Sequence, residues 1–181
     1  GFIGDDGSVV IEVVYDFIER FDNKGMALSE RDGKKGYLNK KGEVVIPFIY
    51  SELSQFEKGL ARVQKDNKWG FINRKNHAQI PVIYDKIADL NKGHAGVIIG
   101  RKFGFVNRNG KEVLPVIYDD IKYFDDGLIG VKKDDKYGYI DTLGKIKVPI
   151  QFDEIGRFYD GICYVKNGKK FGFYRNSGKA I

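Results

Sequence analysis

Hydrophobic and polar residues alternate along this chain in short stretches that return at a fixed interval. The clearest stretch is Lys68-Trp69-Gly70-Phe71-Ile72-Asn73, in which two aromatic residues flank a glycine between a basic and an amide end. The same pattern recurs every 34 residues, at 102–107, 136–141 and 170–175, and a degenerate copy precedes it at 34–39. A fixed period of this kind indicates a tandem-repeat protein in which neighbouring units share a core.

Within one unit the local pattern predicts strands joined by tight turns. Residues 128–133 and 136–141 read as two strands of a hairpin, because Asp134 and Asp135 between them are turn residues. Gly144 marks a second turn, and a third strand follows over residues 146–152. We therefore predict an all-β chain, built as a tandem array of about five three-stranded antiparallel meanders of 34 residues each.

Prolines mark the third strand of each unit. Proline lacks the backbone N–H that a sheet needs, so this strand is predicted to be an edge strand or to carry a bulge. The four prolines of the chain all occupy this position: Pro47, Pro81, Pro115 and Pro149.

The repeat boundaries follow from the period. The units run approximately over residues 1–33, 34–67, 68–101, 102–135 and 136–169, with a partial unit over 170–181, and together predict a single repeat domain over 1–181. The first unit has one extra residue between Phe21 and Gly25, which indicates a loop that tolerates an insertion. Units of this length are shorter than the blades of about 40 to 45 residues in a four-stranded propeller, which favours an open, curved, solenoid-like array. A small five-bladed ring is the alternative.

Three columns of residues recur in phase and are the candidate structural sites. Two aromatic columns are predicted to stack as layers between successive units. The first column is Trp69, Phe103, Tyr137 and Phe171, and the second is Tyr50, Tyr84, Tyr118 and Phe152. The third column is glycine and follows the first aromatic column by one position in the sequence. At these glycines we expect another backbone or an aromatic ring to approach closely. The glycines are Gly36, Gly70, Gly104, Gly138 and Gly172.

Composition supports a packed β protein and narrows its partners. Hydrophobic residues make up 42% of the chain and 23 residues are glycine, as expected for a core joined by many turns. The net charge of +6 is moderate and acidic residues lie among the lysines, so we predict no nucleic-acid partner. No apolar run is long enough to cross a membrane. Because the chain begins at Gly1 inside a repeat, a signal peptide or anchor would lie outside it, and its localisation is not readable.

Candidate catalytic groups are few. His77 and His94 lie in a turn and a loop and are expected to be surface residues, while Cys163 takes the place of alanines in its column and is expected to be a small buried residue. Glycine-rich segments at 104–111 and 138–145 lack the Ser or Thr and the helix of a phosphate-binding loop. Acidic turns at 5–7 and 125–127 lack the alternating ligands of a calcium loop. We therefore predict no enzyme, no cofactor and no metal.

One column of lysines would place a row of positive charges along one edge of the array, which suits the binding of polyanions. The alternative is that these lysines protect the hairpin ends against wrong strand pairing, and the acidic residues beside them favour this interpretation. The column is Lys34, Lys68, Lys102, Lys136 and Lys170.

The repeat as a whole resembles the WG (KWG) repeat family. The fullest copy joins residues 56–63, the stretch 68–73 and the segment 80–85, and the resemblance covers essentially the whole chain, although tryptophan occurs in only one unit. The resemblance implies a β-rich bacterial module, often exported or attached to the cell envelope, without general enzymatic activity and without catalytic residues to carry over. We therefore expect a noncatalytic scaffold that binds another protein within a cell-envelope protein or complex. The alternative is a carbohydrate- or cell-wall-binding module that uses aromatics exposed at the ends or in loops such as that at Phe124.

Overall fold

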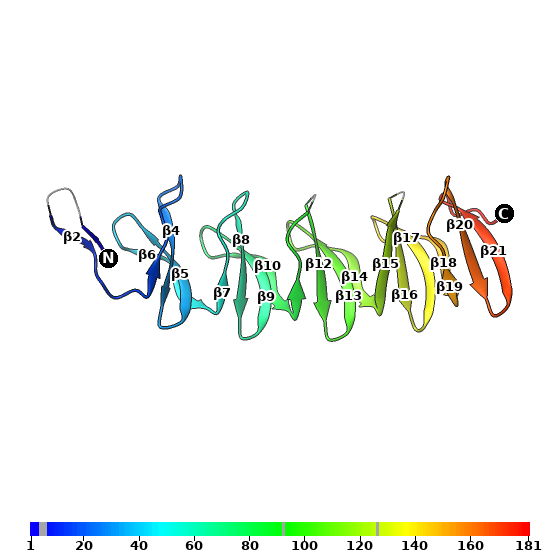
Figure 1. Cartoon of the computed structure of the whole chain (residues 1–181), viewed down its shortest axis with the longest axis horizontal. Coiled ribbons are helices and arrows are strands. Elements are labelled where there is room, and N and C mark those ends of the chain that lie inside the picture. Colours follow the sequence, from blue (N-terminus) through cyan, green and yellow to red (C-terminus); the bar gives the residue numbers. More distant parts are fainter. Residues whose placement is uncertain (4–6, 92, 126) are drawn as a thin grey trace. The chain divides into compact units, whose positions relative to one another are not determined.

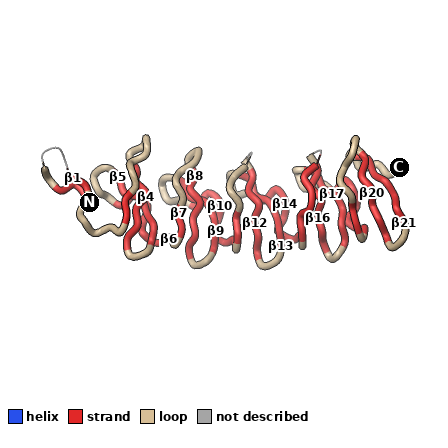
Figure 2. Tube along the Cα trace, viewed as in Figure 1, coloured by secondary structure: helices blue, strands red, loops and turns tan. Residues whose placement is uncertain are grey.

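The computed structural model describes residues 1–3, 7–91, 93–125 and 127–181. For residues 123–125 it describes the backbone alone. All regular secondary structure in this part of the chain is β-strand, and it contains no helix (Figure 2). The acidic turns at 5–7 and 125–127 and the Phe124 side chain fall wholly or partly outside the described residues. The chain divides into two compact units, residues 1–89 and 90–181, and each is described by itself.

The first unit, residues 1–89, contains three antiparallel sheets that follow one another along the chain (Figure 1). The first sheet pairs β1 (Phe2–Ile3) with β2 (Val9–Ile11). The second has the order β3 (Phe17–Ile18), β4 (Met26–Arg31), β5 (Lys34–Asn39) and β6 (Val44–Tyr50). The third has the order β7 (Glu52–Leu53), β8 (Leu60–Lys65), β9 (Lys68–Asn73) and β10 (Ala78–Tyr84), and β11 (Lys86–Ile87) follows it.

The second unit, residues 90–181, repeats this architecture. Its first sheet contains β12 (His94–Ile99), β13 (Lys102–Asn107) and β14 (Glu112–Tyr118). The next has the order β15 (Asp120–Asp125), β16 (Leu128–Lys133), β17 (Lys136–Asp141) and β18 (Ile146–Phe152). The last has the order β19 (Glu154–Ile155), β20 (Ile162–Asn167) and β21 (Lys170–Arg175).

These sheets confirm the all-β tandem array and add one strand before the predicted hairpin in the sheets that begin with β3, β7, β15 and β19. Every pairing described is antiparallel, and none of the sheets closes into a barrel. The additional strand, such as β7, precedes the hairpin and pairs with its first strand. Strands β3, β7 and β19 were missed because a two-residue strand is too short to show an alternating pattern. The prediction of a loop at Phe124 is wrong, because the backbone there belongs to the six-residue strand β15.

The hairpin turns have the backbone conformation that their residues favour. Asp66 and Asn67 join β8 to β9 with φ of 51° and 60°, and Asp134 and Asp135 join β16 to β17 with φ of 50° and 61°. A two-residue turn with positive φ at both positions matches the twist of the strands on either side. The strands consequently stay in register, as the pairing of Lys65 with Lys68 across the first of these turns shows.

The proline-bearing strands are the outer strands of their sheets. Pro81 lies in β10, which is at one end of its sheet and shifts register against β9 between Ile80 and Tyr84. Strands β6, β14 and β18, which carry the other prolines, show the same irregular pairing. The missing N–H therefore falls where the ladder is either unpaired or interrupted.

The core lies between neighbouring sheets rather than inside any one of them. In the first unit, Tyr37 and Ile46 of the β3–β6 sheet pack against Val63 and Ile72 of the β7–β10 sheet. In the second unit the same kind of cluster forms twice, once on each side of the β15–β18 sheet. Central strands such as β17 are consequently buried on both faces, with Tyr139 and Ile140 both 0% exposed. Each sheet depends on its neighbours for its stability.

The glycine column lies against the third strand of the same sheet. A Cβ atom on Gly70 would lie 2.6 Å from the carbonyl oxygen of Ile80, and one on Gly138 would lie 2.6 Å from the carbonyl oxygen of Val148. Such a distance is far below van der Waals contact, so the irregular pairing of the third strand requires a residue without a side chain at this position. At Gly172 the nearest atom would be 3.5 Å away.

The two aromatic columns differ in depth. Tyr50, Tyr84, Tyr118 and Phe152 are all buried in the core. The column that begins at Trp69 is not part of that core. Trp69, Phe103 and Tyr137 are half-buried, and Phe171 is 62% exposed. The second buried aromatic layer is formed instead by the aromatics after the glycine, namely Tyr37, Phe71 and Tyr139.

The shallow position of Trp69 has a physical cause. Its strand has only just left the hairpin turn at Asn67, and the side chain that lies over its ring is Arg62 of the same sheet, with the guanidinium 5.1 Å from the ring centre. The ammonium group of Lys132 lies in the same way 5.7 Å from the ring centre of Tyr137. A cation over an aromatic face is a favourable contact that does not require the ring to be fully buried.

Candidate functional site

Three of the five lysines in the lysine column form ion pairs. Lys68 forms an ion pair with Asp85 at 2.5 Å, Lys102 one with Asp119 at 2.5 Å, and Lys136 one with Asp153 at 2.6 Å. In each pair the lysine begins the second strand and the aspartate follows the third, 17 residues later. These contacts join the second and third strands of three repeats, and they favour the structural interpretation of these three lysines over a polyanion surface.

The amide at the end of the repeated stretch stabilises the second turn. Asn73 Oδ1 accepts hydrogen bonds from the backbone N–H of Lys75 at 2.9 Å and of His77 at 3.1 Å. Asn39, Asn107 and Asp141 accept the same two hydrogen bonds in their own repeats. Short side chains with an acceptor oxygen are preferred in such turns because they satisfy two backbone N–H groups at once.

Asp141 makes the stability of its turn sensitive to pH. Hydrogen bonds from the backbone N–H of Lys145 and, against the opposing effect of burial, from that of Leu143 hold the pKa of Asp141 below its ordinary value. A carboxylate whose pKa is lower in the folded state stabilises the fold above its unfolded pKa, and this contribution is lost as the pH falls below about 4. We expect Asp141→Asn to keep the turn, since Asn occupies this position in other repeats, and to reduce the acid sensitivity of unfolding.

Urea unfolding measured from pH 7 to pH 2 checks this expectation. The matched control is Asn107→Asp, which installs the carboxylate in the preceding repeat and should increase the acid sensitivity. Identical pH profiles for both variants and the natural chain would show that the turn residue carries no such effect.

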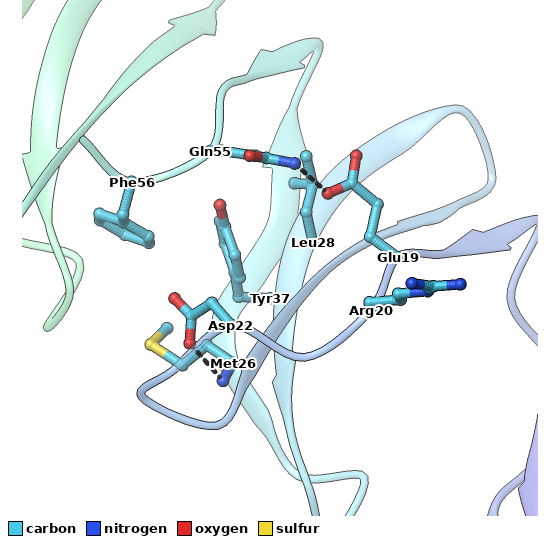
Figure 3. Close-up of a pocket in the computed structure, with 8 residues that line it drawn as sticks. All are labelled: Glu19, Arg20, Asp22, Met26, Leu28, Tyr37, Gln55 and Phe56. Atoms are coloured by element: carbon cyan, nitrogen blue, oxygen red, sulfur yellow. Dashed lines mark hydrogen bonds between the residues drawn. The ribbon is translucent and has the colours of Figure 1, made fainter.

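A pocket in the first unit lies beside the loop that carries the extra residue of the first repeat. It has a volume of about 170 Å³ and is lined by Glu19, Arg20, Asp22, Met26, Leu28, Tyr37, Gln55 and Phe56. Figure 3 shows Tyr37 between Phe56 and Leu28, with Glu19 and Gln55 joined by a hydrogen bond of 2.7 Å. Met26 and Tyr37 are buried, whereas Gln55 and Arg20 are exposed, so the pocket has an apolar floor and a polar mouth.

The extra residue of the first repeat builds one wall of this pocket. It lengthens the loop between Phe21 and Gly25, in which Asp22 Oδ1 accepts hydrogen bonds from the backbone N–H of Lys24 and of Met26. The other carboxylate oxygen of Asp22 forms an ion pair with Arg74 at 2.7 Å.

Arg74 connects that loop to the next repeat. Its guanidinium lies 4.5 Å from the ring centre of Phe56 and donates to the sulfur of Met26 at 3.3 Å. The planar guanidinium is suited to such a contact. It stacks on an aromatic ring with its face, while its N–H groups bind a carboxylate that lies in the plane of the guanidinium.

The pKa values of Asp22 and Tyr37, two ionisable residues of the pocket, are shifted in opposite directions. Burial opposes ionisation of Asp22, but hydrogen bonds from Met26, Arg74 and Lys24 outweigh it and lower the pKa of this carboxyl group. Burial also raises the pKa of Tyr37, and the charges of Glu19 and Asp22 raise it further, against a smaller opposing effect of Arg74. The Tyr37 hydroxyl donates to the carbonyl oxygen of Ser54 at 3.0 Å.

Cys163 is buried and His77 lies at the surface, as predicted, whereas His94 begins strand β12 and does not lie in a loop. His77 and His94 are exposed. Cys163 is 1% exposed, and its burial raises the pKa of the thiol to about 11, which disfavours the thiolate that nucleophilic chemistry requires. Among the described residues, no group of three or more His, Cys, Asp or Glu side chains is arranged to hold a metal ion. The described chain also contains no helix with the length and apolar character of a membrane span.

Sequence reasoning missed the pocket. Two signals were available: the insertion between Phe21 and Gly25, and the departures from the repeat at Glu19 and Gln55. Neither reveals that Asp22 and Arg74, 52 positions apart, form an ion pair. That contact requires the packing of one sheet on the next, which the local pattern does not specify.

The fold is that of a tandem-repeat β protein whose core is shared between neighbouring sheets. The chain belongs to the family of WG containing repeats, whose model matches residues 1–34, 36–69, 69–103, 103–137 and 137–171. A search of curated proteins found no match.

Several solved structures are distantly similar. They include Hsv2p of Kluyveromyces lactis (7% identity, TM-score 0.36, covering 91% of this chain and 61% of that one). A eukaryotic initiation factor gives 8% identity and a TM-score of 0.39, covering 94% and 56%. The extracellular domain of a putative one-component system from B. thetaiotaomicron gives 11% identity and a TM-score of 0.35, covering 97% and 30%. The chain spans less than two thirds of each of these proteins, and the likeness is too weak to carry an argument about function.

Proposed function

We propose that this chain is a noncatalytic repeat module that binds another protein, and that the pocket at Tyr37 and Phe56 anchors one side chain of that partner. The observation that carries the proposal is the pocket itself, in which the loop lengthened by the extra residue of the first repeat stands beside the recurring aromatics Tyr37 and Phe56. Sites for cofactors and drug-sized ligands have volumes of about 300 to 1,000 Å³. A pocket of about 170 Å³ has room for a side chain, which is how protein interfaces concentrate their binding energy.

The chemistry of the pocket favours a long basic side chain. Met26, Leu28 and Tyr37 form an apolar lining, and the Glu19 carboxylate at the mouth accepts a hydrogen bond from the neutral amide of Gln55. Asp22, in contrast, has its charge balanced by Arg74. A lysine or arginine of the partner would bury its methylene stem against the lining and place its charge beside Glu19.

We further propose that the module acts within a bacterial cell-envelope protein or complex. This setting is the one that the WG repeat resemblance implies.

Blocking the pocket mouth tests the proposed function. We expect Gln55→Trp, at an exposed position, to leave the fold intact and to reduce the amount of partner captured from native membranes at least tenfold. Asp89→Trp is the matched control, because Asp89 lies 34 residues later at the same position of the next repeat and is also exposed. Quantitative affinity capture followed by mass spectrometry provides the measurement.

Equal capture by Gln55→Trp and by the natural chain would contradict the assignment of the pocket. Capture of glycans in place of a stoichiometric protein would contradict protein binding and support the carbohydrate alternative.

A further inference from the structure

The pocket of the first unit contains two carboxylates, and that of Asp22 is already occupied by the protein itself. Its Oδ1 accepts hydrogen bonds from the backbone N–H groups of Lys24 at 2.8 Å and of Met26 at 3.0 Å. Its Oδ2 binds the guanidinium of Arg74 at 2.7 Å. A guanidinium of this chain therefore fills the place beside Asp22, and a ligand could use this carboxylate only by displacing it.

The carboxylate of Glu19 keeps one open oxygen. Its Oε2 accepts the hydrogen bond of 2.7 Å from the side-chain amide of Gln55. Its Oε1 has no hydrogen-bond partner within the part of the chain that the structure describes. Glu19 is half-buried, and a charge beside an apolar lining is screened less than one in open water. Glu19 Oε1 is thus the acceptor that the pocket offers to a cationic ligand.

The cationic side chain at the mouth is turned out of the pocket. Arg20 is one of the lining residues, but it is exposed, and Figure 3 shows its guanidinium directed away from Tyr37 and Phe56. The lining beside Tyr37 is apolar, with Met26 and Leu28 packed in the same cluster. An unbranched methylene chain can lie along these residues while a cation at its end reaches the open oxygen.

We propose that the pocket selects lysine over arginine, because its open acceptor suits an ammonium group and not a guanidinium. A guanidinium binds a carboxylate most strongly through two parallel N–H groups, one to each oxygen. At Glu19 this arrangement requires the oxygen that Gln55 occupies. An ammonium group is a compact point charge that a single oxygen can bind. This inference rests on the proposed function, since it names the side chain that the partner places in the pocket.

Two short peptides that differ only in a central lysine or arginine provide the test. Each is titrated at millimolar concentration into the full chain, and the NMR signals of the Leu28 and Tyr37 amides report binding. We expect the lysine peptide to bind about tenfold more tightly than the arginine peptide. Glu19→Gln should abolish the binding of both. The matched control is Glu57→Gln, which removes a charge at an exposed position outside the pocket lining and should bind both peptides as the natural chain does.

Gln55→Ala should reverse the preference, because it frees Glu19 Oε2 for a second N–H group. We expect the affinity for the arginine peptide to rise about tenfold and that for the lysine peptide to change little. Circular dichroism checks that each variant keeps its fold.

The outcomes separate this inference from the proposed function. An arginine peptide that binds the natural chain as tightly as the lysine peptide overturns the selectivity and leaves a basic anchor in place. An unchanged preference in Gln55→Ala also overturns it, because the occupied oxygen would then not be the cause. If neither peptide shifts the Leu28 and Tyr37 signals, the pocket does not hold a basic side chain, and the anchor in the proposed function is overturned together with the inference.

Discussion

Replacing Tyr139 by alanine should lower the free energy of unfolding by about 3 to 5 kcal/mol, which is a large share of the stability of a domain of this size. Tyr139 is 0% exposed, and its ring packs edge-on against Phe158 with the ring centres 4.8 Å apart. Its hydroxyl donates to the carbonyl oxygen of Gly156 at 2.8 Å. The substitution therefore opens a cavity between two sheets and leaves a buried carbonyl group without this donor.

Phe173→Ala is the matched control, because Phe173 occupies the same column but is half exposed. We expect it to cost about 1 kcal/mol or less. Tyr139→Phe separates the two contributions, since it keeps the ring and removes the hydrogen bond, at an expected cost of about 1 to 2 kcal/mol. Urea unfolding at concentrations where the chain is monomeric measures all three. Equal effects of the two alanine variants would show that the β15–β18 sheet is not stabilised by the sheet that follows it.

Gly138→Ala should destabilise the protein by about 3 kcal/mol, although it adds a single methyl group. The added Cβ would lie 2.6 Å from the carbonyl oxygens of both Val148 and Pro149. These atoms belong to the backbone of β18, so the methyl group cannot be accommodated by a change of side-chain rotamer. The third strand has to move away from β17, and the irregular pairing around the proline is lost.

Gly172→Ala provides the comparison in the same column. The nearest atom to its Cβ is Val165 Cγ2 at 3.5 Å, an ordinary contact. We expect this variant to change stability by less than about 0.5 kcal/mol, or to stabilise slightly, because alanine restricts the unfolded chain. A similar loss of stability in both variants would show that the requirement for glycine lies in the strand itself rather than in the approach of β18.

Features that depend on neighbouring residues could be predicted from the sequence. The Asp66-Asn67 turn follows from the tolerance of these residues for positive φ, and the outer position of β10 follows from the missing N–H of Pro81. The ion pair between Lys68 and Asp85 was not predicted, although the predicted meander places the start of its second strand beside the end of its third.

Features that depend on the packing of one sheet on another could not be predicted in the same way. The pattern does not tell which of two aromatics on one face of β9 is the deeper, and Phe71 rather than Trp69 is the buried one. The pocket depends on a loop in one repeat and on Arg74 in another, and its walls come together only when two sheets pack. Periodicity identifies the shared core, whereas a pocket with one wall formed by a loop that a single repeat lengthens requires the three-dimensional structure.

The claim that the protein binds its partner through the pocket of the first unit, and not through the equivalent surface one repeat later, is tested most directly by site-specific photo-crosslinking in cells that make the protein. A photoreactive amino acid at Gln55, on the pocket mouth, should give a covalent adduct with one protein partner. The same group at Asp89, the equivalent exposed position one repeat later, should give little or none of it. Equal adducts from both positions, or adducts from Asp89 alone, would contradict the claim.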